Sequence, residues 1–417
     1  MTDAGQQGPA RKRRGIGELL TKAPFAIIAS SLQGFVNYFI VLYLTYDAGA
    51  ADTGTYRALF SFYSLLGLAS MFETNKVFIR SIVADDKEAT TALFANRMLF
   101  SWGTLLLIGL VYGLSRAAGS ESVPVSLLLI AGLSAIIYPL DSYLSFLQAR
   151  GRFQLLFWFE LVKYSAALAT FLLMLRSGAS IESAVLAQLA AMALCHVAYF
   201  SLIVREFVDF GATRRRFGAM IRSSAAGQAR TYSVANIFPA SLEHVDKLLV
   251  GWMFGLEFLG IYTLAYSTGR FLYNALKPAL YVYYRRFVDR MPGPKLLRTV
   301  TIAFTIVGLV NAALFVAALA WIPEMEPFRS GAAATIILFL SYGTGILHAV
   351  YGQAFALNKD SEASHALRAS ILATAAAAIL LCCALLSEPG VALVLLALQY
   401  PLRDVLSVWL MARLRRS

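Results

Sequence analysis

Long apolar segments recur along this chain, and they restrict its fold more than any other feature. Hydrophobic residues make up 59% of the 417 positions and charged residues 14%, whereas soluble proteins contain about 25% charged residues. A helix of about 20 apolar residues is long enough to cross a bilayer. The sequence therefore predicts an all-α polytopic membrane protein.

About twelve segments have a suitable length and composition. The predicted spans are residues 24–44, 56–79, 93–114, 125–148, 155–175, 182–204, 227–250, 261–284, 299–320, 331–355, 367–386 and 391–411. The longest interior loop follows the sixth span, so the spans divide six and six. The expected parts are a basic N-terminal segment 1–23, a six-helix bundle 24–204, a linker 205–226, a second bundle 227–411 and a tail 412–417.

Basic residues alternate between loops, and this alternation predicts the orientation. One set includes the runs Arg11–Arg14 and Arg214–Arg216, whereas the opposite loops contain only Arg116, Arg176 and Arg329. Lys and Arg mark cytoplasmic loops, so both termini are expected in the cytoplasm. The expected location is the inner (plasma) membrane of the cell. The net charge of +12 is then mainly a topogenic signal, and no nucleic-acid partner is expected.

A weak internal repeat supports the division into two halves. GTYRALFSFYS at 54–64 aligns with GIYTLAYSTGR at 260–270, which pairs Gly54 with Gly260. FLQARG at 146–151 also resembles FALNKD at 355–360. Each half enters and leaves on the same side, so we expect parallel repeats related by an axis along the membrane normal.

Polar side chains share one face of the predicted span 261–284. They are Tyr266, Arg270, Tyr273, Asn274 and Lys277, which recur at helical spacing. A cation at the bilayer centre costs about 2.5–3.5 kcal/mol on insertion scales, so this face predicts a wet, cationic lumen. The alternative is ion pairing of the two cations with carboxylates of other helices, such as Asp141 or Glu160.

The first span adds two polar candidates. Gln33 and Asn37 lie four residues apart on one face and could contact sugar hydroxyls. Polar residues also hold membrane helices together, which is the alternative role. Together with the face of span 261–284, these residues are the predicted substrate site.

Three carboxylates within the spans are candidates for binding a coupling proton or sodium ion. Asp141 has no partner nearby in sequence and is the first choice, because burial favours the protonated form of a carboxylate. Glu73 and Glu160 are the next choices, although each has a lysine three residues later, Lys76 and Lys163. The simpler interpretation is that each of those two glutamates pairs with its lysine.

A charged group in the seventh span is a candidate gate. Glu243, Asp246 and Lys247 follow Pro239, which would kink the helix. Glu243 and Lys247 are four residues apart and are expected to pair.

The same region resembles a known family. Asp246, Val250, Gly251, Gly255, Gly260, Tyr262 and Ala265 look like the D-x-x-x-VG-x-x-x-G-x-x-x-x-G-x-Y-x-x-A stretch of polysaccharide-export proteins. Those proteins are Wzx-type lipid-linked oligosaccharide flippases of the multidrug/oligosaccharidyl-lipid/polysaccharide exporter superfamily. The resemblance implies two six-helix bundles around a central cavity lined by helices 1, 2, 7 and 8.

The resemblance to this family also gives the expected function. The resemblance implies that the chain translocates a polyprenyl-pyrophosphate-linked oligosaccharide across the inner membrane by alternating access, for surface polysaccharide such as O-antigen or exopolysaccharide. Besides this substrate and the membrane lipids, the polysaccharide polymerase machinery is a candidate partner.

Other function classes fit the sequence less well. It has no P-loop, G-x-S-x-G or H-E-x-x-H motif, so no enzyme, cofactor or metal site is expected, and a membrane polymerase or ligase would need a large exterior loop. The three cysteines lie within apolar segments, which argues against a disulfide framework. The main alternative is a cation-coupled drug exporter of the multidrug and toxic compound extrusion type, which would bind organic cations and so prefer an acidic, aromatic pocket. A scaffold would leave the intramembrane cations unexplained.

The predicted orientation can be tested with single cysteines. Cysteines at Ala51, Ser120, Ser177 and Ser387 should react from outside with an impermeant thiol reagent, and cysteines at Ala212 and Ser361 should not. The opposite labelling pattern would invert the topology.

Overall fold

The computed structural model describes residues 10–71, 74–119, 124–209, 211, 218–277, 292–357 and 363–414. Its regular elements in these ranges are helical. The helices are α1 (Ala10–Asp47), α2 (Ala50–Ala69), α3 (Asn75–Val83), α4 (Lys87–Ala117), α5 (Val125–Leu140), α6 (Ser142–Ala149), α7 (Phe153–Arg176), α8 (Ile181–Phe207), α10 (Ser224–Phe254), α11 (Leu256–Leu276), α13 (Pro294–Trp321), the 3-10 helix η3 (Pro323–Phe328), α14 (Ala332–Leu340), α15 (Tyr342–Leu357), α16 (Ala363–Leu385) and α17 (Pro389–Leu414).

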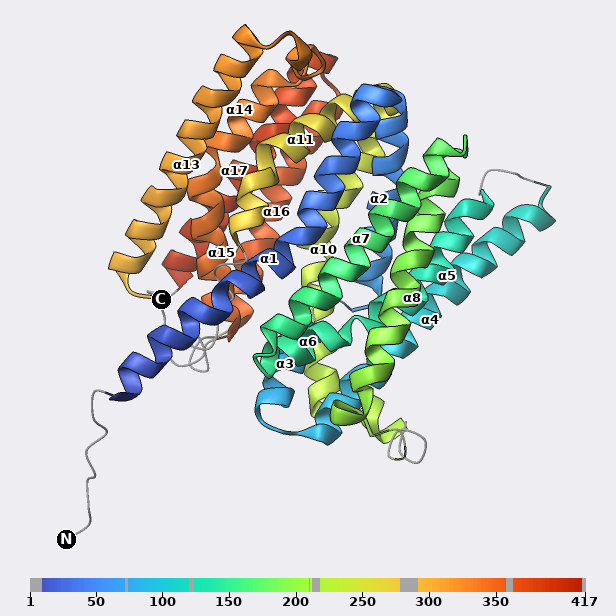
Figure 1. The fold of residues 1–417 in the computed structure, drawn as a ribbon, viewed down its shortest axis with the longest axis vertical. Coiled ribbons are helices and arrows are strands. Elements are labelled where there is room, and N and C mark those ends of the chain that lie inside the picture. Colours follow the sequence, from blue (N-terminus) through green and yellow to red (C-terminus); the bar gives the residue numbers. More distant parts are fainter. Residues whose placement is uncertain are drawn as a thin grey trace.

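The helices form two groups that follow the order of the chain. Figure 1 shows α3 to α8 together on one side and α13 to α17 on the other, with α1, α10 and α11 running between them. The apolar core is continuous across the two groups, because it includes Ile130 and Phe171 of the first together with Phe315 and Tyr342 of the second. The predicted fold class, an all-α polytopic membrane protein, is confirmed.

The fourth predicted span of each half is broken in the structure. In the first half α5 ends and α6 begins around Asp141, just after Pro139, where the proline ring removes a helical hydrogen bond. In the second half α14 and α15 meet at Ser341 with a bend of 49°, and the glycine at 343 weakens the helix there. Each break lies inside a predicted span, and the first places Asp141 beside Arg97 of α4.

Membrane-spanning character is unevenly distributed among the helices. Eight helices of the described ranges are long and apolar enough to cross a membrane, or nine if the bent pair α14 and α15 is one span. Helices α2, α10 and α11 are not among these. They carry charged residues where the two groups of helices face each other, and polar residues at membrane depth are tolerated where they meet water or other protein groups.

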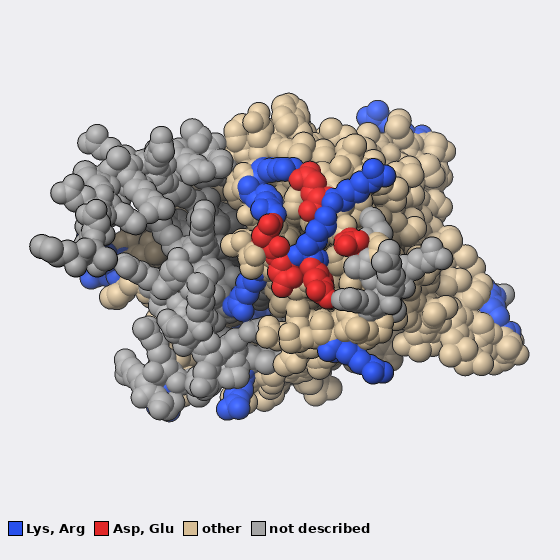
Figure 2. All heavy atoms as spheres, turned by 90° about the horizontal axis from the view of Figure 1, so that it is seen from below, with Lys and Arg blue, Asp and Glu red and all other residues tan. Residues whose placement is uncertain are grey.

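Charged side chains also gather at one end of the molecule. Figure 2 shows this face from below, with residues of both signs close together. In the loops beside α3, α6 and α8, Arg150 pairs with Asp85, and Arg152 makes a two-armed contact with Glu206 at 3.0 and 2.8 Å. Part of the positive charge that predicts the cytoplasmic side is therefore matched locally, although exposed pairs of this kind stabilise the fold little.

Helices α2 and α11 make the closest contact between the two halves, and glycines allow it. A Cβ atom at Gly54 would overlap with the carbonyl oxygen of Leu256, and one at Gly260 would overlap with that of Ala50. These are the two glycines that the internal repeat pairs. Because only a residue without a side chain fits this backbone contact, it holds the predicted exterior ends of the halves together.

Substituting one of these glycines should disrupt the contact. Gly260→Ala forces backbone atoms apart, and overpacking of this kind typically costs about 1–3 kcal/mol, so the detergent-solubilised variant should unfold several degrees below the wild type. Gly132→Ala is the matched control, since nothing lies within 4 Å of a Cβ there. Equal melting temperatures for the Gly260 variant and the control would show that the contact is not required.

Candidate functional site

A cavity of about 760 Å³ lies between the two groups of helices. Residues from α1, α2, α5, α7, α8, α10, α11, α15, α16 and α17 contribute to its wall. All seven predicted substrate residues line it: Gln33, Asn37, Tyr266, Arg270, Tyr273, Asn274 and Lys277. The lining is therefore wider than helices 1, 2, 7 and 8, and it includes the charged helix α17.

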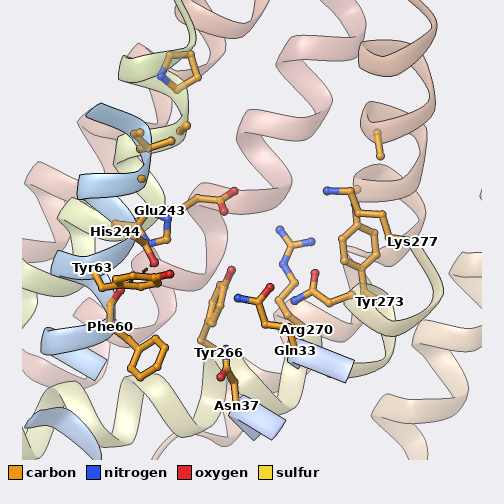
Figure 3. A pocket seen from close by; sticks show the side chains of 18 of the residues that line it. Gln33, Asn37, Phe60, Tyr63, Glu243, His244, Tyr266, Arg270, Tyr273 and Lys277 are labelled. Carbon is orange, nitrogen blue, oxygen red and sulfur yellow. Dashed lines mark hydrogen bonds between the residues drawn. The ribbon is translucent and has the colours of Figure 1, made fainter. Parts of the chain in front are cut away.

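Helix α11 presents its predicted polar face to this cavity. Figure 3 shows Arg270, Tyr273 and Lys277 on this side, with Gln33 and Asn37 nearby and Glu243 and His244 across the space. The Arg270 guanidinium carbon lies 4.9 Å from the ring centres of both Tyr273 and Tyr400. These cation–π contacts fix the guanidinium of a side chain that is 4% exposed.

The charges on the cavity wall are mainly positive. Its cations are Arg57, Lys163, Arg270, Lys277 and Arg403, and its carboxylates are Asp141, Glu243 and Asp404. Five cations against three carboxylates leave an excess of positive charge among the described residues. A cavity with this balance suits an anion better than an organic cation.

Several of these charges in the second half form a connected chain. Arg403 Nη2 lies 2.6 Å from Glu243 Oε1, and His348 Nδ1 lies 2.6 Å from Asp404 Oδ1. Asp404 Oδ2 is 3.8 Å from Arg270 Nη2. The partner of Arg270 is therefore Asp404, and not Asp141 or Glu160 as the ion-pairing alternative proposed.

The three predicted gate residues separate into two environments. Glu243 lines the cavity, whereas Asp246 and Lys247 are fully buried behind α11. The expected side-chain pair of Glu243 with Lys247 is wrong, because Arg403 takes the Glu243 carboxylate. Lys247 Nζ instead contacts Asp246 Oδ1 at 2.9 Å and the Glu243 backbone carbonyl at 2.6 Å.

Hydroxyl groups complete this buried cluster around Asp246. Its Oδ2 accepts hydrogen bonds from Tyr262 at 2.9 Å and Tyr400 at 3.1 Å, and Gln399 donates at 3.2 Å. A buried carboxylate with this many donors is satisfied. The cluster ties α10 to α11 and α17 behind the cavity wall.

The carboxylates of the first half are also paired. Asp141 lies on the cavity wall, but the expectation that it has no partner is wrong, since Arg97 Nη2 is 2.9 Å from its Oδ1. Glu160 and Lys163 form the expected pair at 2.7 Å, with a further hydrogen bond from Tyr143 at 3.1 Å. Only the lysine of this pair reaches the cavity. Glu73 lies outside the described residues.

A sequence profile described as "Polysaccharide biosynthesis protein" matches residues 49–282, more than half of the chain. The chain belongs to this polysaccharide biosynthesis family. No curated protein matches it in sequence.

Solved structures show the same fold as this family member over nearly its whole length. A variant of the Vibrio cholerae MATE transporter VcmN is 16% identical, covering 97% of this chain and 98% of its own, with a TM-score of 0.57. The MATE multidrug transporter DinF-BH is 14% identical over 96% of this chain and 95% of its own, with a TM-score of 0.59. A MOP superfamily transporter from Pyrococcus furiosus is 13% identical over 95% of both chains, with a TM-score of 0.53. The protein therefore has the fold of MOP superfamily transporters.

Three charged residues of the cavity were missed by sequence reasoning. Arg403 and Asp404 follow Pro401 inside the apolar span 391–411, and this pair of charges at membrane depth was a usable signal. Arg57 stands in the repeat segment 54–64, and its guanidinium lies 5.6 Å from the ring centre of Tyr266 in the other half. Its neighbours in sequence give no sign of this contact.

The Arg97–Asp141 pair provides a test of its structural role. Arg97→Met should lower stability by about 3–5 kcal/mol, because it leaves a buried carboxylate without its partner. The double variant Arg97→Met/Asp141→Leu should recover much of this loss, as measured by thermal unfolding of the purified protein.

Arg116→Met at the exposed end of the same helix α4 is the control and should unfold like the wild type. If the double variant is less stable than Arg97→Met alone, the contribution of Arg97 to stability does not come from its pair with Asp141.

Proposed function

We propose that this protein flips a polyprenyl-pyrophosphate-linked oligosaccharide from the cytoplasmic to the exterior leaflet of the inner membrane, for surface polysaccharide biosynthesis. The observation that carries the proposal is the excess of cations on the wall of the cavity, in a member of a polysaccharide biosynthesis family. Alternating movement of two bundles, 24–204 and 227–411 about the linker 205–226, would expose the cavity to each side in turn.

The cavity residues match the chemistry of such a headgroup. Arg270 offers a planar fork and Lys277 a point charge for the oxygens of a pyrophosphate. The amides of Gln33, Asn37 and Asn274 can donate to and accept from sugar hydroxyls. The rings of Tyr266 and Tyr273 also line the cavity and offer flat surfaces for sugar rings.

The prenyl tail has an apolar surface outside the cavity. The seam between α1 and α11 is closed by a hydrogen bond of 2.7 Å from Ser31 Oγ to the Ala275 carbonyl. Beside it on α1, Phe35 and Phe39 are each 49% exposed, as expected for side chains facing lipid. The tail can remain against this surface while the polar headgroup enters the lumen.

A drug exporter is the alternative that the fold allows, because MATE multidrug transporters share it. Export of organic cations favours a pocket that is both acidic and aromatic. This cavity has aromatic rings, such as Tyr266 and Tyr273, but its cations outnumber its carboxylates. The Pyrococcus furiosus transporter is described as having a binding pocket of reverse polarity that suggests a different function, so the sign of the cavity is a reasonable guide. Asp141 remains our proposed site for a coupling ion, and a polymerase remains a proposed partner.

Charge reversal in the cavity tests the proposal. Each charge-assisted hydrogen bond is worth roughly 1.5–3 kcal/mol, so loss of Arg270 or Lys277 should weaken apparent affinity by about ten- to a hundredfold. Arg270→Glu and Lys277→Glu should be worse than alanine, and Arg270→Lys should retain part of the activity. The measurement is surface polysaccharide in a complemented deletion strain.

Arg176→Glu, exposed at the end of α7, is the control and should support normal polysaccharide. Membrane abundance of every variant must match the wild type. Normal polysaccharide from both cavity glutamate variants at normal abundance would refute an anion-binding lumen.

A further inference from the structure

Three polar atoms of one charged group in the cavity wall are buried without a hydrogen bond. They are Arg270 Nε, Arg403 Nε and Asp404 Oδ2, which have no hydrogen-bond partner among the described residues. Buried polar groups in folded proteins are nearly always hydrogen-bonded, so exceptions call for an explanation. Other cavity residues also have such atoms, namely Arg57 Nε, Asp141 Oδ1 and His244 Nδ1. The three atoms of Arg270, Arg403 and Asp404 differ in belonging to adjoining side chains, which indicates one incomplete site.

Only one carboxylate oxygen of Asp404 is held by a close contact, and its partner is His348. Its Oδ1 is held by His348 Nδ1 at 2.6 Å, while its Oδ2 is 3.8 Å from Arg270 and its Oδ1 is 3.9 Å from Arg403 Nε. Both distances to arginine are within ion-pair range but too long for hydrogen bonds. The carboxylate therefore neutralises the two arginines without using their donors.

We propose that Asp404, with Glu243 beside it, is a built-in counter-ion that occupies the anion site of Arg270 and Arg403 when the cavity is empty and is displaced by the substrate's pyrophosphate. The identity of the displacing anion rests on the proposed function above. The two Nε donors are buried in the empty cavity, so phosphate oxygens would reach them only when Asp404 moves away from the arginines, while Asp404 would keep its contact with His348. When the anion leaves, the carboxylate again balances the arginines.

The other buried carboxylates do not fit this role, because their partners are close. Glu160 Oε1 lies 2.7 Å from Lys163 Nζ. Asp141 Oδ1 lies 2.9 Å from Arg97 Nη2, a close ion pair although the two atoms do not form a hydrogen bond. Asp246 receives donors from Tyr262, Tyr400, Gln399 and Lys247. An incoming anion would have to break short contacts in each of these cases, but at Asp404 it replaces long ones.

A counter-ion of this kind has opposite effects on the affinity for pyrophosphate and on the rate of transport. Without Asp404, Arg270 loses its carboxylate and Arg403 keeps only its pair with Glu243. Such a site should hold a pyrophosphate more tightly and release it more slowly, whereas an internal competitor weakens binding and assists release. Removing the Asp404 charge should therefore raise affinity and lower flux at the same time. A purely structural role for Asp404 would lower both.

The test uses the purified full-length protein and inorganic pyrophosphate, measured by titration calorimetry in a chelator-containing buffer, together with surface polysaccharide in cells. Asp404→Asn should bind pyrophosphate about tenfold more tightly than wild type and produce less polysaccharide. His348→Ala should bind it more weakly, because Asp404 is then free to turn fully to the arginines. Glu206→Gln, a carboxylate variant at the exposed Arg152 pair, is the control and should match wild type in both assays.

Opposite shifts in the two cavity variants would support the counter-ion, and size-exclusion profiles establish that each variant is folded. Unchanged or weaker binding in folded Asp404→Asn would overturn it. If Asp404→Asn does not fold, unchanged or tighter binding in His348→Ala overturns it equally. Absence of pyrophosphate binding in wild type and both variants would also overturn it, while the polysaccharide assay of Arg270→Glu decides the proposed function separately.

Discussion

The cost of placing cations at membrane depth is the constraint on which this structure depends. A lysine or arginine facing hydrocarbon loses its hydration, so the charged faces of α2, α10, α11 and α17 must turn toward each other and toward a wet space. The apolar helices, such as α4 and α13, then remain outside and meet lipid. This one requirement accounts for the cavity between the halves and for the arrangement of charged helices around it and apolar helices outside.

The two halves satisfy their buried charges in different ways. In the first half, Asp141 and Glu160 are closely paired with cations. The pair of Asp141 with Arg97 joins α4 to the junction of α5 and α6, whereas Glu160 and Lys163 pair within α7. In the second half, Asp246 accepts several hydrogen bonds behind the wall and Arg403 pairs closely with Glu243, but Asp404 lies 3.8 Å from Arg270 and 3.9 Å from Arg403. Short pairs stabilise one arrangement of helices, whereas the long pairs around Asp404 leave arginine donors without a hydrogen bond among the described residues. This difference is why we place the proposed anion site in the second half.

The sequence predicted those features that depend on local spacing. The polar face of α11 could be predicted because its members recur every three or four residues, and the pair Glu160–Lys163 because it spans one helical turn. The partner of Asp141 could not, since Arg97 is on another helix and only the folded arrangement brings them together. Likewise, the sequence predicts that Glu243 pairs with Lys247 one turn away, but its partner in the structure is Arg403 of α17. Long-range electrostatic partners depend on how helices pack, and composition and periodicity do not specify that packing.

The contact of Gly54 and Gly260 also bears on how such a protein arose. Each glycine approaches the first residue of the opposite helix, Gly54 at Leu256 of α11 and Gly260 at Ala50 of α2, so the two contacts correspond to each other in the two halves. In a symmetric dimer, a residue close to the two-fold axis meets its own counterpart in the other subunit. If the halves descend from one duplicated gene, a single glycine in the ancestral subunit was enough to create both sides of this contact. After fusion the two positions became free to diverge, yet neither can gain a side chain while the opposite backbone remains in place.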